Sequence, residues 1–297
     1  MPTNTPRAVF VTRESDYELL LARHATREQA RFFLETRGQR IALLEDRHHQ
    51  LHDALRQARS AVPGDWRQAQ VRRLDLDRFL FGPEDVIVPI GQDGLVANVA
   101  KYLAGQPVLG VNPSPDLYDG VLVRLALSQL PELLRASVAD RAPLEHRTMV
   151  EAKLDTGERL LALNEVFVGH RSHQSARYTI AAGATHEDHS SSGLIVASGT
   201  GATGWARSIM EATGAHLPIG LEERAIAYFV REPFPSIATG TAMRAGKLAG
   251  EPLDVTSRMN DGGVIFADGM EQDFLAFDWG RRVSVSPAAN ALHLVTG

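Results

Sequence analysis

The segment from Val86 to Leu103 constrains the fold of this chain more than any other. Its first part, Val86–Ile90, is apolar and rich in β-branched residues, which is typical of a strand buried on both faces. A glycine-containing turn, Gly91-Gln92-Asp93-Gly94, comes next, and Val96–Leu103 then has a helical pattern. A buried strand that leads through such a turn into a helix predicts an open α/β sheet with parallel strands.

The turn would place the carboxylate of Asp93 at the C-terminal edge of the sheet, beside a helix N-terminus. Open α/β sheets build phosphate-handling sites at this edge. A carboxylate there can orient or deprotonate a hydroxyl group next to a polyphosphate. Asp-Gly also forms ordinary turns, so this motif alone leaves both interpretations open.

The pattern of secondary structure changes near residue 140. Before it, helical residues over Ser15–Ser60 are followed by alternating strands and helices, the strands at Asp85–Ile90 and Val108–Val111 and a helix at Leu125–Ser137. After it, short strands alternate with turns. The strands expected there are Thr148–Lys153, Glu158–Val168, Ala176–Ala181, Gly193–Val196, Ala225–Phe229, Leu253–Ser257, Gly263–Ala267, Arg282–Ser286 and Leu292–Val295.

This change predicts two domains. Residues 1–138 are expected to form an N-terminal open α/β sheet domain that carries the Gly-x-Asp-Gly turn. Residues 139–297 are expected to form a C-terminal antiparallel β-rich domain, sandwich-like, with one helix near Gly204–Thr213.

Composition excludes several classes of protein. The chain has 297 residues, a formal net charge of −5 and no cysteine. Disulfides, thiolate catalysis and thiolate metal sites are therefore excluded, and no overall positive charge indicates a nucleic-acid partner. The N-terminus lacks the apolar core of a signal peptide, and no apolar run is long enough to cross a bilayer. We expect a soluble, cytoplasmic protein that binds neither nucleic acid nor membrane.

A polar pair, Asn164-Glu165, interrupts the apolar run Leu161–Val168. An amide and a carboxylate at core depth cost several kcal/mol unless both are hydrogen-bonded. One interpretation is a strand edge or bulge whose polar groups are satisfied locally. The other is the floor of a cleft, where these groups bind a polar ligand such as a ribose.

A second motif begins where the expected strand Leu194–Ala197 enters a loop of glycines and hydroxyl residues, Ser198–Gly204. Glycines permit close approach of a ligand to the backbone. Hydroxyl and N–H groups in such a loop can bind an anion. Trp205, at the start of the following helix, is either a core residue or an aromatic face on which a base stacks. The hydroxyl groups are those of Ser198, Thr200 and Thr203.

Taken together and in this order, the motifs resemble the NAD kinase family. That family has Gly-Gly-Asp-Gly-Thr, then Gly-x-Asn, then an Asn-Glu strand, then Thr-Pro-Thr-Gly-Ser-Thr-Ala-Tyr. The corresponding segments of this chain are Gly91–Gly94, Gly110–Asn112, Asn164-Glu165 and Gly199–Trp205. The sequence looks most similar to the branch that includes the animal mitochondrial NAD kinase, on the evidence of Leu43–His49, Gly110–Pro115, Ala162–Val168, Ser191–Leu194 and Arg231–Pro233.

The resemblance implies a two-domain enzyme with its ligand between the domains. Members of the family phosphorylate the adenosine-ribose 2′-hydroxyl of NAD to give NADP. They use ATP or another phosphoryl donor, with Mg²⁺ or a similar divalent cation. They usually assemble as homodimers or homotetramers, and we expect the same of this chain.

The resemblance also implies roles for individual residues. Asp93 matches the catalytic carboxylate, which acts as a general base or as an orienting acceptor for the attacking hydroxyl. Ser208, on the following helix turn, is a further expected contact. The expected nucleotide-binding residues are Gly91, Gly94, Asn164, Glu165, Ser192, Thr200, Gly201, Thr203, Gly204 and Trp205.

Several residues depart from the family pattern. Gln92 replaces a glycine at the phosphate turn, Leu95 replaces a threonine, and Ser192 replaces an aspartate found in many members. Gly204-Trp205 stands for Ala-Tyr, and Asp119–Leu122 is the nearest equivalent of a Gly-Phe-Leu segment. These departures leave an alternative: a nucleotide-binding member with an altered donor or acceptor, or without phosphotransfer activity.

Histidines offer a different hypothesis. Two His-x-x-His pairs could ligate zinc, but they flank the expected hairpin strand Ala176–Ala181, where exposed loop histidines are common. We assign no metal ligand from the sequence. His48 and His49 are interpreted as surface or interdomain groups, and Asp268-Gly269 as a hairpin turn whose family counterpart lies close to the dinucleotide. The two pairs are His170 with His173 and His186 with His189.

Overall fold

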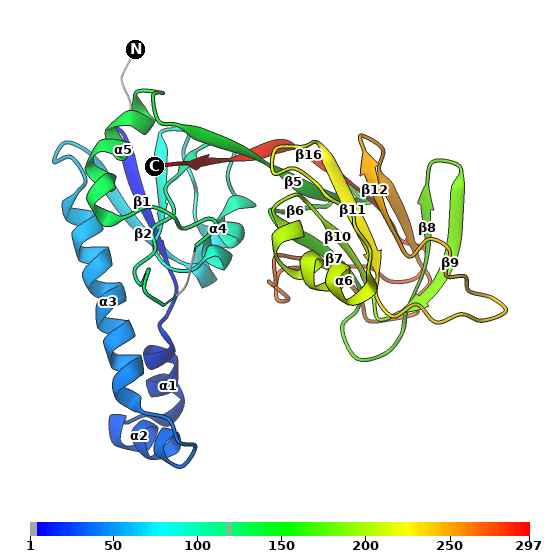
Figure 1. Ribbon diagram of the computed structural model, residues 1–297, viewed down its shortest axis with the longest axis horizontal. Coiled ribbons are helices and arrows are strands. Elements are labelled where there is room, and N and C mark those ends of the chain that lie inside the picture. Colours follow the sequence, from blue (N-terminus) through cyan, green and yellow to red (C-terminus); the bar gives the residue numbers. More distant parts are fainter. Residues whose placement is uncertain (1–4, 118–119) are drawn as a thin grey trace. The chain divides into compact units, whose positions relative to one another are not determined.

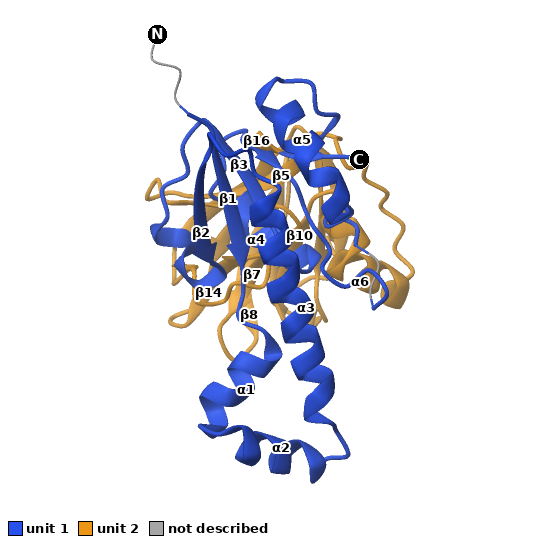
Figure 2. Ribbon diagram, turned by 90° about the vertical axis from the view of Figure 1, so that its left-hand side faces the viewer, with its two compact units in different colours: residues 1–145, 293–297 blue, residues 146–292 orange. Residues whose placement is uncertain are grey.

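The computed structural model describes residues 5–117 and 120–297, and Asp119 lies outside them. The chain forms two compact units, coloured separately in Figure 2. Unit 1 comprises residues 1–145 and 293–297, and unit 2 comprises residues 146–292. The C-terminal residues therefore belong to the unit that the N-terminal residues build.

Unit 1 contains a parallel sheet in the order β2-β1-β3-β4-β16. Strands β1 and β2 have six residues each and β3 has five. β3 is buried along its whole length, as its apolar sequence predicts. The predicted open α/β fold is confirmed for this unit. The strands are β1 (Arg7–Thr12), β2 (Arg67–Arg72), β3 (Asp85–Pro89), β4 (Pro107–Val108) and β16 (Arg282–Val295).

Helices cover this sheet because its central strands β1 and β3 are apolar and buried on both faces, whereas β2 is mostly exposed. One cluster of buried side chains joins β1 and β3 to α3 and α5, through residues such as Phe10, Val88, Leu55 and Leu134. α4 is buried at every residue from Leu95 to Ala100. The helices are α3 (Ile41–Ser60), α4 (Asp93–Ala100) and α5 (Leu130–Val138), with 3₁₀ turns at Arg73–Arg78 and Leu127–Gln129.

Two further helices, α1 (Asp16–His24) and α2 (Arg27–Glu35), lie beside the N-terminal end of α3 (Figure 1). α1 begins with a capping box, since Ser15 Oγ accepts from the Glu18 amide and the Glu18 side chain accepts from the Ser15 amide. No residue of α1 is fully buried. The cluster that holds the three helices is small, with only Ala30, Leu34 and Ile41 fully buried in it.

Unit 2 has an antiparallel sheet in the order β12-β11-β10-β7-β14-β15. A second set of strands, β16-β13-β8-β9 with β5 and β6, packs against it. The strands are β5 (Leu144–Leu154), β6 (Arg159–Ala162), β7 (Glu165–His170), β8 (Ala176–Ala182), β9 (Thr185–Ser191), β10 (Leu194–Ala197), β11 (Ala225–Val230), β12 (Ala245–Ala249), β13 (Leu253–Ser257), β14 (Gly263–Ala267) and β15 (Phe274–Ala276).

Strand alternation decides what each face of β7 contacts. Val166 and Val168 belong to the main core between the two sheets, with Tyr178 and Val255 on the opposite side. Phe167 points the other way, into a second cluster that α6 (Trp205–Thr213) covers. Glu165 is two residues from Phe167, so it shares this second face.

The predicted strands differ from the structure in two places. The single strand expected over Glu158–Val168 is instead β6 and β7, separated at Leu163-Asn164, because the chain passes there from one sheet to the other. The strands expected at Arg282–Ser286 and Leu292–Val295 are one long strand, β16. Its first residues pair with β13 in unit 2, and His293 and Leu294 pair with β4 in unit 1. No described helix combines the length and apolarity needed to cross a membrane.

Candidate functional site

The Gly-x-Asp-Gly turn stands where the sequence predicts it, between β3 and α4. β3 ends at Pro89, Gln92 is the N-cap of α4, and Asp93 is its first residue. The Gln92 side chain makes no capping hydrogen bond. A Cβ atom added at Gly94 would meet no atom of the described residues within 4 Å. The fold therefore does not require glycine at this position, and the backbone there is open to a ligand.

The carboxylate of Asp93 holds three consecutive backbone amides. Oδ2 accepts from Val121 N at 2.9 Å, and Oδ1 accepts from Leu122 N at 2.8 Å and Val123 N at 3.1 Å. The first two amides belong to the segment Asp119–Leu122, the nearest equivalent of the family's Gly-Phe-Leu, and Val123 follows it. Because a carboxylate has about four acceptor positions, one position stays available for a ligand hydroxyl.

A hollow of about 210 Å³ adjoins the turn within unit 1. Two arginines that the sequence analysis did not single out for a role, Arg13 and Arg47, line it, together with Glu14 and Asp16. Its other lining residues are Ser15, Leu51, Ile90, Gly91, Gln92, Pro113, Ser114 and Leu117. Guanidinium groups beside a helix N-terminus suit a phosphate-bearing ligand.

In unit 2 the carboxylate of Asp268 likewise accepts hydrogen bonds from three consecutive backbone amides, two of them those of the Asn164-Glu165 pair. Oδ2 accepts from Leu163 N at 2.8 Å, while Oδ1 accepts from Asn164 N at 2.8 Å and Glu165 N at 3.3 Å. Asp268 has φ of 49°, a left-handed conformation that aspartate tolerates in turns. The hairpin turn predicted at Asp268-Gly269 is thus also the anchor of the Asn-Glu motif, which sequence order could not reveal.

Asp268 also acts on Glu165. Burial and the nearby charge of Asp268 raise the pKa of Glu165 to about 8. At neutral pH this carboxyl group is mostly protonated, so it can both donate and accept hydrogen bonds. A group with both capacities is suited to sugar hydroxyls.

The loop Ser198–Gly204 packs directly on the Asn-Glu motif. Ser198 N donates to Asn164 O at 2.9 Å, and a Cβ atom at Gly201 would lie 2.1 Å from that same oxygen. A Cβ atom at Gly199 would lie 2.1 Å from Gly220 O. The two glycines therefore permit close approach of the chain to itself, where the sequence analysis expected a ligand.

The hydroxyl groups of this loop are differently placed. Ser198 Oγ donates to Leu163 O at 2.5 Å and accepts from two loop amides, so it is engaged inside the loop. Thr203 Oγ1 donates to Thr200 O at 2.8 Å. Thr200 Oγ1 is buried without a hydrogen-bond partner among the described residues. Thr203 and Gly204 are exposed, as is Ser208 on α6.

Trp205 lies on the same face of the sheet as Glu165 and Phe167. Its ring is stacked with that of Phe167, with an interplanar angle of 8° and centroids 6.5 Å apart, and the Arg231 guanidinium lies 5.3 Å from its centroid. Trp205 is 38% exposed, so part of its ring is accessible to a ligand. The glycines Gly169 and Gly193 make room for Phe167, since Cβ atoms there would lie 2.4 and 2.5 Å from its ring.

A hollow of about 640 Å³ opens beside these rings within unit 2. It contains Ser192 and Trp205 from the predicted set, and Arg231 and Phe167, which were not predicted as site residues. Aromatic rings with arginines at hand are the usual means of binding a nucleotide base and its phosphates. The remaining lining residues are His170, Arg171, Ser172, His173, Gln174, Ser175, Val264, Phe266, Glu271 and Phe274.

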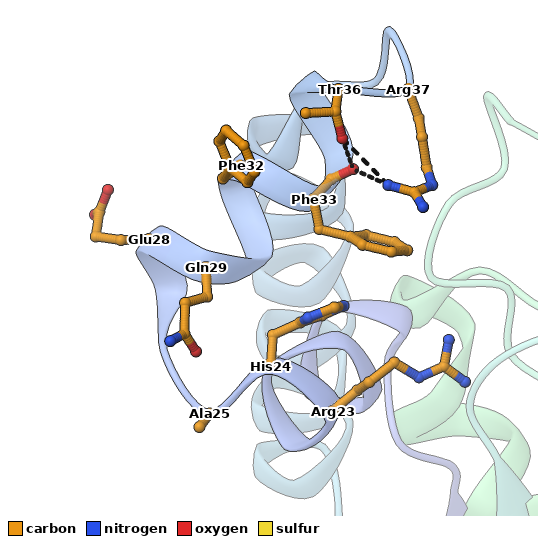
Figure 3. Close-up of a pocket in the computed structure, with 9 residues that line it drawn as sticks. All are labelled: Arg23, His24, Ala25, Glu28, Gln29, Phe32, Phe33, Thr36 and Arg37. Atoms are coloured by element: carbon orange, nitrogen blue, oxygen red, sulfur yellow. Dashed lines mark hydrogen bonds between the residues drawn. The ribbon is translucent and has the colours of Figure 1, made fainter.

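A third hollow, of about 660 Å³, lies where α1 meets α2 and contains no predicted site residue (Figure 3). Two of its polar side chains, Arg37 and His24, pack on Phe33. The Arg37 guanidinium lies 3.7 Å from the centroid of the Phe33 ring and donates to Phe33 O at 3.0 Å. The His24 ring lies 4.4 Å from the same phenyl ring. We assign this hollow no role.

The zinc hypothesis for the four C-terminal-half histidines finds no support in the described part of the chain, where no group of three ligands includes any of them. His189 is buried and pairs with Glu187 at 2.9 Å, while His170 contacts the Ser172 hydroxyl at 2.8 Å. His48, interpreted above as a surface or interdomain group, lies on α3. It is half-buried against α1, with its Nδ1 2.8 Å from Ser15 Oγ.

Each unit thus brings together its own predicted residues. Unit 1 gathers Gly91, Asp93 and Gly94 at one turn, and unit 2 gathers the Asn-Glu pair, the glycine loop and Trp205. The structure defines each unit by itself, so the predicted meeting of the two sets around one dinucleotide stays a prediction.

Similarity to known proteins agrees with these motifs. The sequence matches no model of a known protein family. It is 36% identical over 132 residues to an NAD kinase of Heliobacterium modesticaldum, covering 42% of this chain and 46% of that protein. It is 30% identical over 130 residues to NAD kinase 2 of Trichormus variabilis, covering 41% of each. The chain aligns with less than half the length of these curated relatives.

Two solved structures share the fold along nearly the whole chain. The yeast NADH kinase complexed with NADH has a TM-score of 0.60 and 15% identity, covering 99% of this chain and 84% of that one. The Archaeoglobus fulgidus NAD kinase in complex with ATP has a TM-score of 0.59 and 16% identity, covering 98% and 93%. At this identity the likeness concerns the fold. The narrower resemblance to the animal mitochondrial branch stays a prediction.

The chain therefore has the fold of NAD kinases over nearly its whole length and matches them in sequence over about two fifths of it, which supports its assignment to the NAD kinase family.

Proposed function

We propose that the protein is an NAD kinase, which transfers a phosphoryl group from ATP to the adenosine-ribose 2′-hydroxyl of NAD and yields NADP. The observation that carries this proposal is the position of Asp93, at the end of a buried parallel strand and the start of α4. The curated relatives, which are named NAD kinases, favour the same reaction over other phosphoryl transfers.

Asp93 is proposed to orient the attacking hydroxyl. Phosphoryl transfer needs chiefly positioning and neutralisation of charge, with a carboxylate beside the nucleophile. Three amides already share the Asp93 carboxylate. Its remaining acceptor position can take the hydrogen bond of the 2′-hydroxyl and point the oxygen at the donor phosphorus. The resemblance implies that Asp93 acts either as a general base or as an orienting acceptor. The hydrogen bonds from three amides favour the orienting acceptor.

The donor is proposed to enter the hollow beside Gly91, where Arg13 and Arg47 offer guanidinium groups to its phosphates. Gly94 gives the phosphates access to the backbone. Glu14 and Asp16 line the same hollow with carboxylate oxygens, the ligands that Mg²⁺ accepts alongside phosphate oxygens. These residues fit a divalent cation that arrives with the nucleotide and neutralises phosphate charge.

The acceptor is proposed to bind unit 2. Asn164 and the protonated Glu165 offer hydrogen bonds to ribose hydroxyls, and the exposed part of Trp205 offers an aromatic surface to a base. Thr203, Gly204 and Ser208 are exposed close to Trp205 in sequence and are proposed as further contacts. Thr200 and Gly201 are proposed to act by shaping the loop.

An assay for NADP tests the proposal. Purified protein is incubated with NAD, Mg²⁺ and ATP, and NADP is detected with an NADP-specific dehydrogenase. Parallel reactions replace ATP with other nucleoside triphosphates or with polyphosphate, and NAD with NADH. We expect NADP that depends on protein, NAD and donor.

A thermal-shift measurement under the same conditions distinguishes an NAD kinase from a protein that binds NAD without phosphorylating it. If NAD raises the melting temperature while no donor yields NADP, the protein is a nucleotide-binding member of the family without phosphotransfer. If NAD neither reacts nor raises the melting temperature, the proposed acceptor is wrong.

A further inference from the structure

We propose that Glu18, His48 and His52 form a binding site for a divalent transition metal such as Zn²⁺, which fastens helix α1 to helix α3. This site is separate from the residues proposed to act on NAD and ATP. None of its three ligands lines the hollow proposed for the phosphoryl donor, although Ser15 and Arg47 beside them do.

The three side chains already face one another. His52 Nε2 lies 3.6 Å from Glu18 Oε1, and His48 Nδ1 lies 4.0 Å from Glu18 Oε2. The two imidazole rings have centroids 4.3 Å apart, and one ligand atom from each of the three residues lies within 4.8 Å of the others. Among the described residues this is the one group of three such side chains that is close enough to share a metal ion.

The spacing follows from the helix. His48 and His52 are four residues apart on α3, so their side chains lie one above the other on the same face. Imidazole nitrogens bind zinc at about 2.0 to 2.1 Å, which puts two ligand atoms of a tetrahedral site about 3.4 Å apart. The observed separations need only small side-chain rotations to reach this value.

Glu18 is held in place before any metal binds. Its side chain accepts from the Ser15 amide at 2.7 Å in the capping box of α1, so the carboxylate has a fixed direction. Ser15 Oγ lies 2.8 Å from His48 Nδ1. A metal ion would take the place of this contact, and the hydroxyl or water would complete the coordination shell.

Two nitrogens and one carboxylate oxygen define the class of metal. This donor set suits Zn²⁺, Co²⁺ or Ni²⁺ better than Mg²⁺, which prefers oxygen ligands alone. His52 and Glu18 are 46% and 40% exposed, so an ion can enter from solvent.

The proposed site lies between α1 and α3, where a bound ion would stabilise the contact between the two helices. α1 has no fully buried residue, and the cluster that joins the three helices is small. One ion between Glu18 on α1 and the histidines on α3 would add a cross-link that the apolar contacts do not supply. Since Ser15 also lines the hollow beside Gly91, the ion would fix one wall of that hollow.

The test uses full-length protein freed of metal with a chelator and then dialysed. Zn²⁺ is titrated by calorimetry, and Co²⁺ by its visible absorption, for the wild type and for His48→Gln, His52→Gln and Glu18→Gln. His49→Gln is the matched control, because it removes the neighbouring histidine of the same helix. We expect the wild type and His49→Gln to bind the metal with similar affinity. In His48→Gln, His52→Gln and Glu18→Gln the affinity should fall by at least about tenfold.

Hydrogen exchange gives a second measurement. Zn²⁺ is expected to slow amide exchange in α1 of the wild type and of His49→Gln, but not in His52→Gln. Circular dichroism confirms that each variant is folded; exposed His52 makes His52→Gln the safest of the three. The proposal is overturned if His52→Gln binds Co²⁺ and Zn²⁺ as the wild type does, if His49→Gln loses as much affinity, or if the wild type binds neither ion.

Discussion

Asp93 in unit 1 and Asp268 in unit 2 make the same pattern of hydrogen bonds but lie in different surroundings. Each carboxylate accepts hydrogen bonds from three consecutive backbone amides, Asp93 from residues 121–123 and Asp268 from residues 163–165. Asp93 stands beside an open turn and a hollow lined by arginines. Asp268 stands behind Glu165, where burial and, after it, the charge of Asp268 raise the pKa of Glu165.

The difference teaches that a motif cannot be judged by its hydrogen bonds alone. Both aspartates organise a loop, but only Asp93 also lies at a helix N-terminus where a phosphate-bearing ligand can approach. We therefore treat Asp93 as the candidate catalytic residue and Asp268 as a positioning residue that acts through Asn164 and Glu165.

The largest expected effect comes from replacing each aspartate with asparagine. Asp93→Asn should lower kcat by at least about 100-fold, because an amide has one acceptor oxygen and cannot orient the hydroxyl while holding three amides. Asp268→Asn should chiefly raise KM for NAD. Both should lower the free energy of unfolding by about 1 kcal/mol or more, through lost hydrogen bonds.

Steady-state kinetics and thermal unfolding of the two variants decide between the roles. If Asp268→Asn lowers kcat as far as Asp93→Asn does, the distinction between a catalytic and a positioning aspartate fails.

Replacing one glycine in each unit tests how closely the two motifs are packed, through the free energy of unfolding. Gly201→Ala should destabilise unit 2 by about 2 kcal/mol or more, since its Cβ atom would lie 2.1 Å from Asn164 O. Gly94→Ala should leave the stability of the protein within about 0.5 kcal/mol, since no atom of the described residues lies within 4 Å of its Cβ atom. It should weaken the binding of the phosphoryl donor instead.

Urea unfolding and KM for ATP measure the two effects. Equal stability losses in Gly94→Ala and Gly201→Ala would show that the turn in unit 1 is as closely packed as the loop in unit 2.

Trp205 tests the stacking surface of unit 2. Trp205→Ala should weaken NAD binding by about 1 to 3 kcal/mol, or roughly five- to 150-fold, as lost stacking on a base does. Trp205→Phe should keep most of the affinity, and KM for ATP should change in neither variant. Fluorescence or calorimetric titration with NAD gives the affinities, and an unchanged affinity in Trp205→Ala would remove this residue from the site.

The smallest expected effect concerns Glu165 and pH. Because the pKa of Glu165 is raised to about 8 in the folded protein, the folded state binds more protons than the unfolded state between about pH 4.5 and 8. This residue therefore makes stability fall as pH rises through that range. Glu165→Gln mimics the protonated form and should flatten the profile, so that the variant is more stable than the wild type at pH 8 by about 1 kcal/mol or more.

Unfolding measured at pH 6, 7 and 8 tests this expectation. Asp93→Asn is the comparison variant. If the two variants have the same pH profile, the pKa of Glu165 is not raised in the folded protein.

Local patterns were enough to predict much of the fold. The apolar run of β3, the helical spacing of α3 and the alternating strands after residue 140 predicted an α/β sheet followed by an antiparallel domain, and the structure confirms that fold class. The ordered motifs likewise predicted the NAD kinase family, since each depends on residues adjacent in sequence.

What lies far apart in sequence could not be predicted in this way. Asp268 reaches amides more than one hundred residues before it, and β16 pairs with strands of both units. Leu163-Asn164 separates two strands because the chain changes sheets there, a fact that its apolar flanks conceal.

The sequence by itself determined the elements, their order and the chemical groups available, because strand and helix periodicity and turn chemistry are local properties. Only the tertiary structure decided which amides each aspartate holds, which glycines face the chain itself and which face open space, and that Glu18 meets two histidines of another helix. Those outcomes depend on packing between distant segments, where distances of a few tenths of an ångström separate a hydrogen bond from a clash.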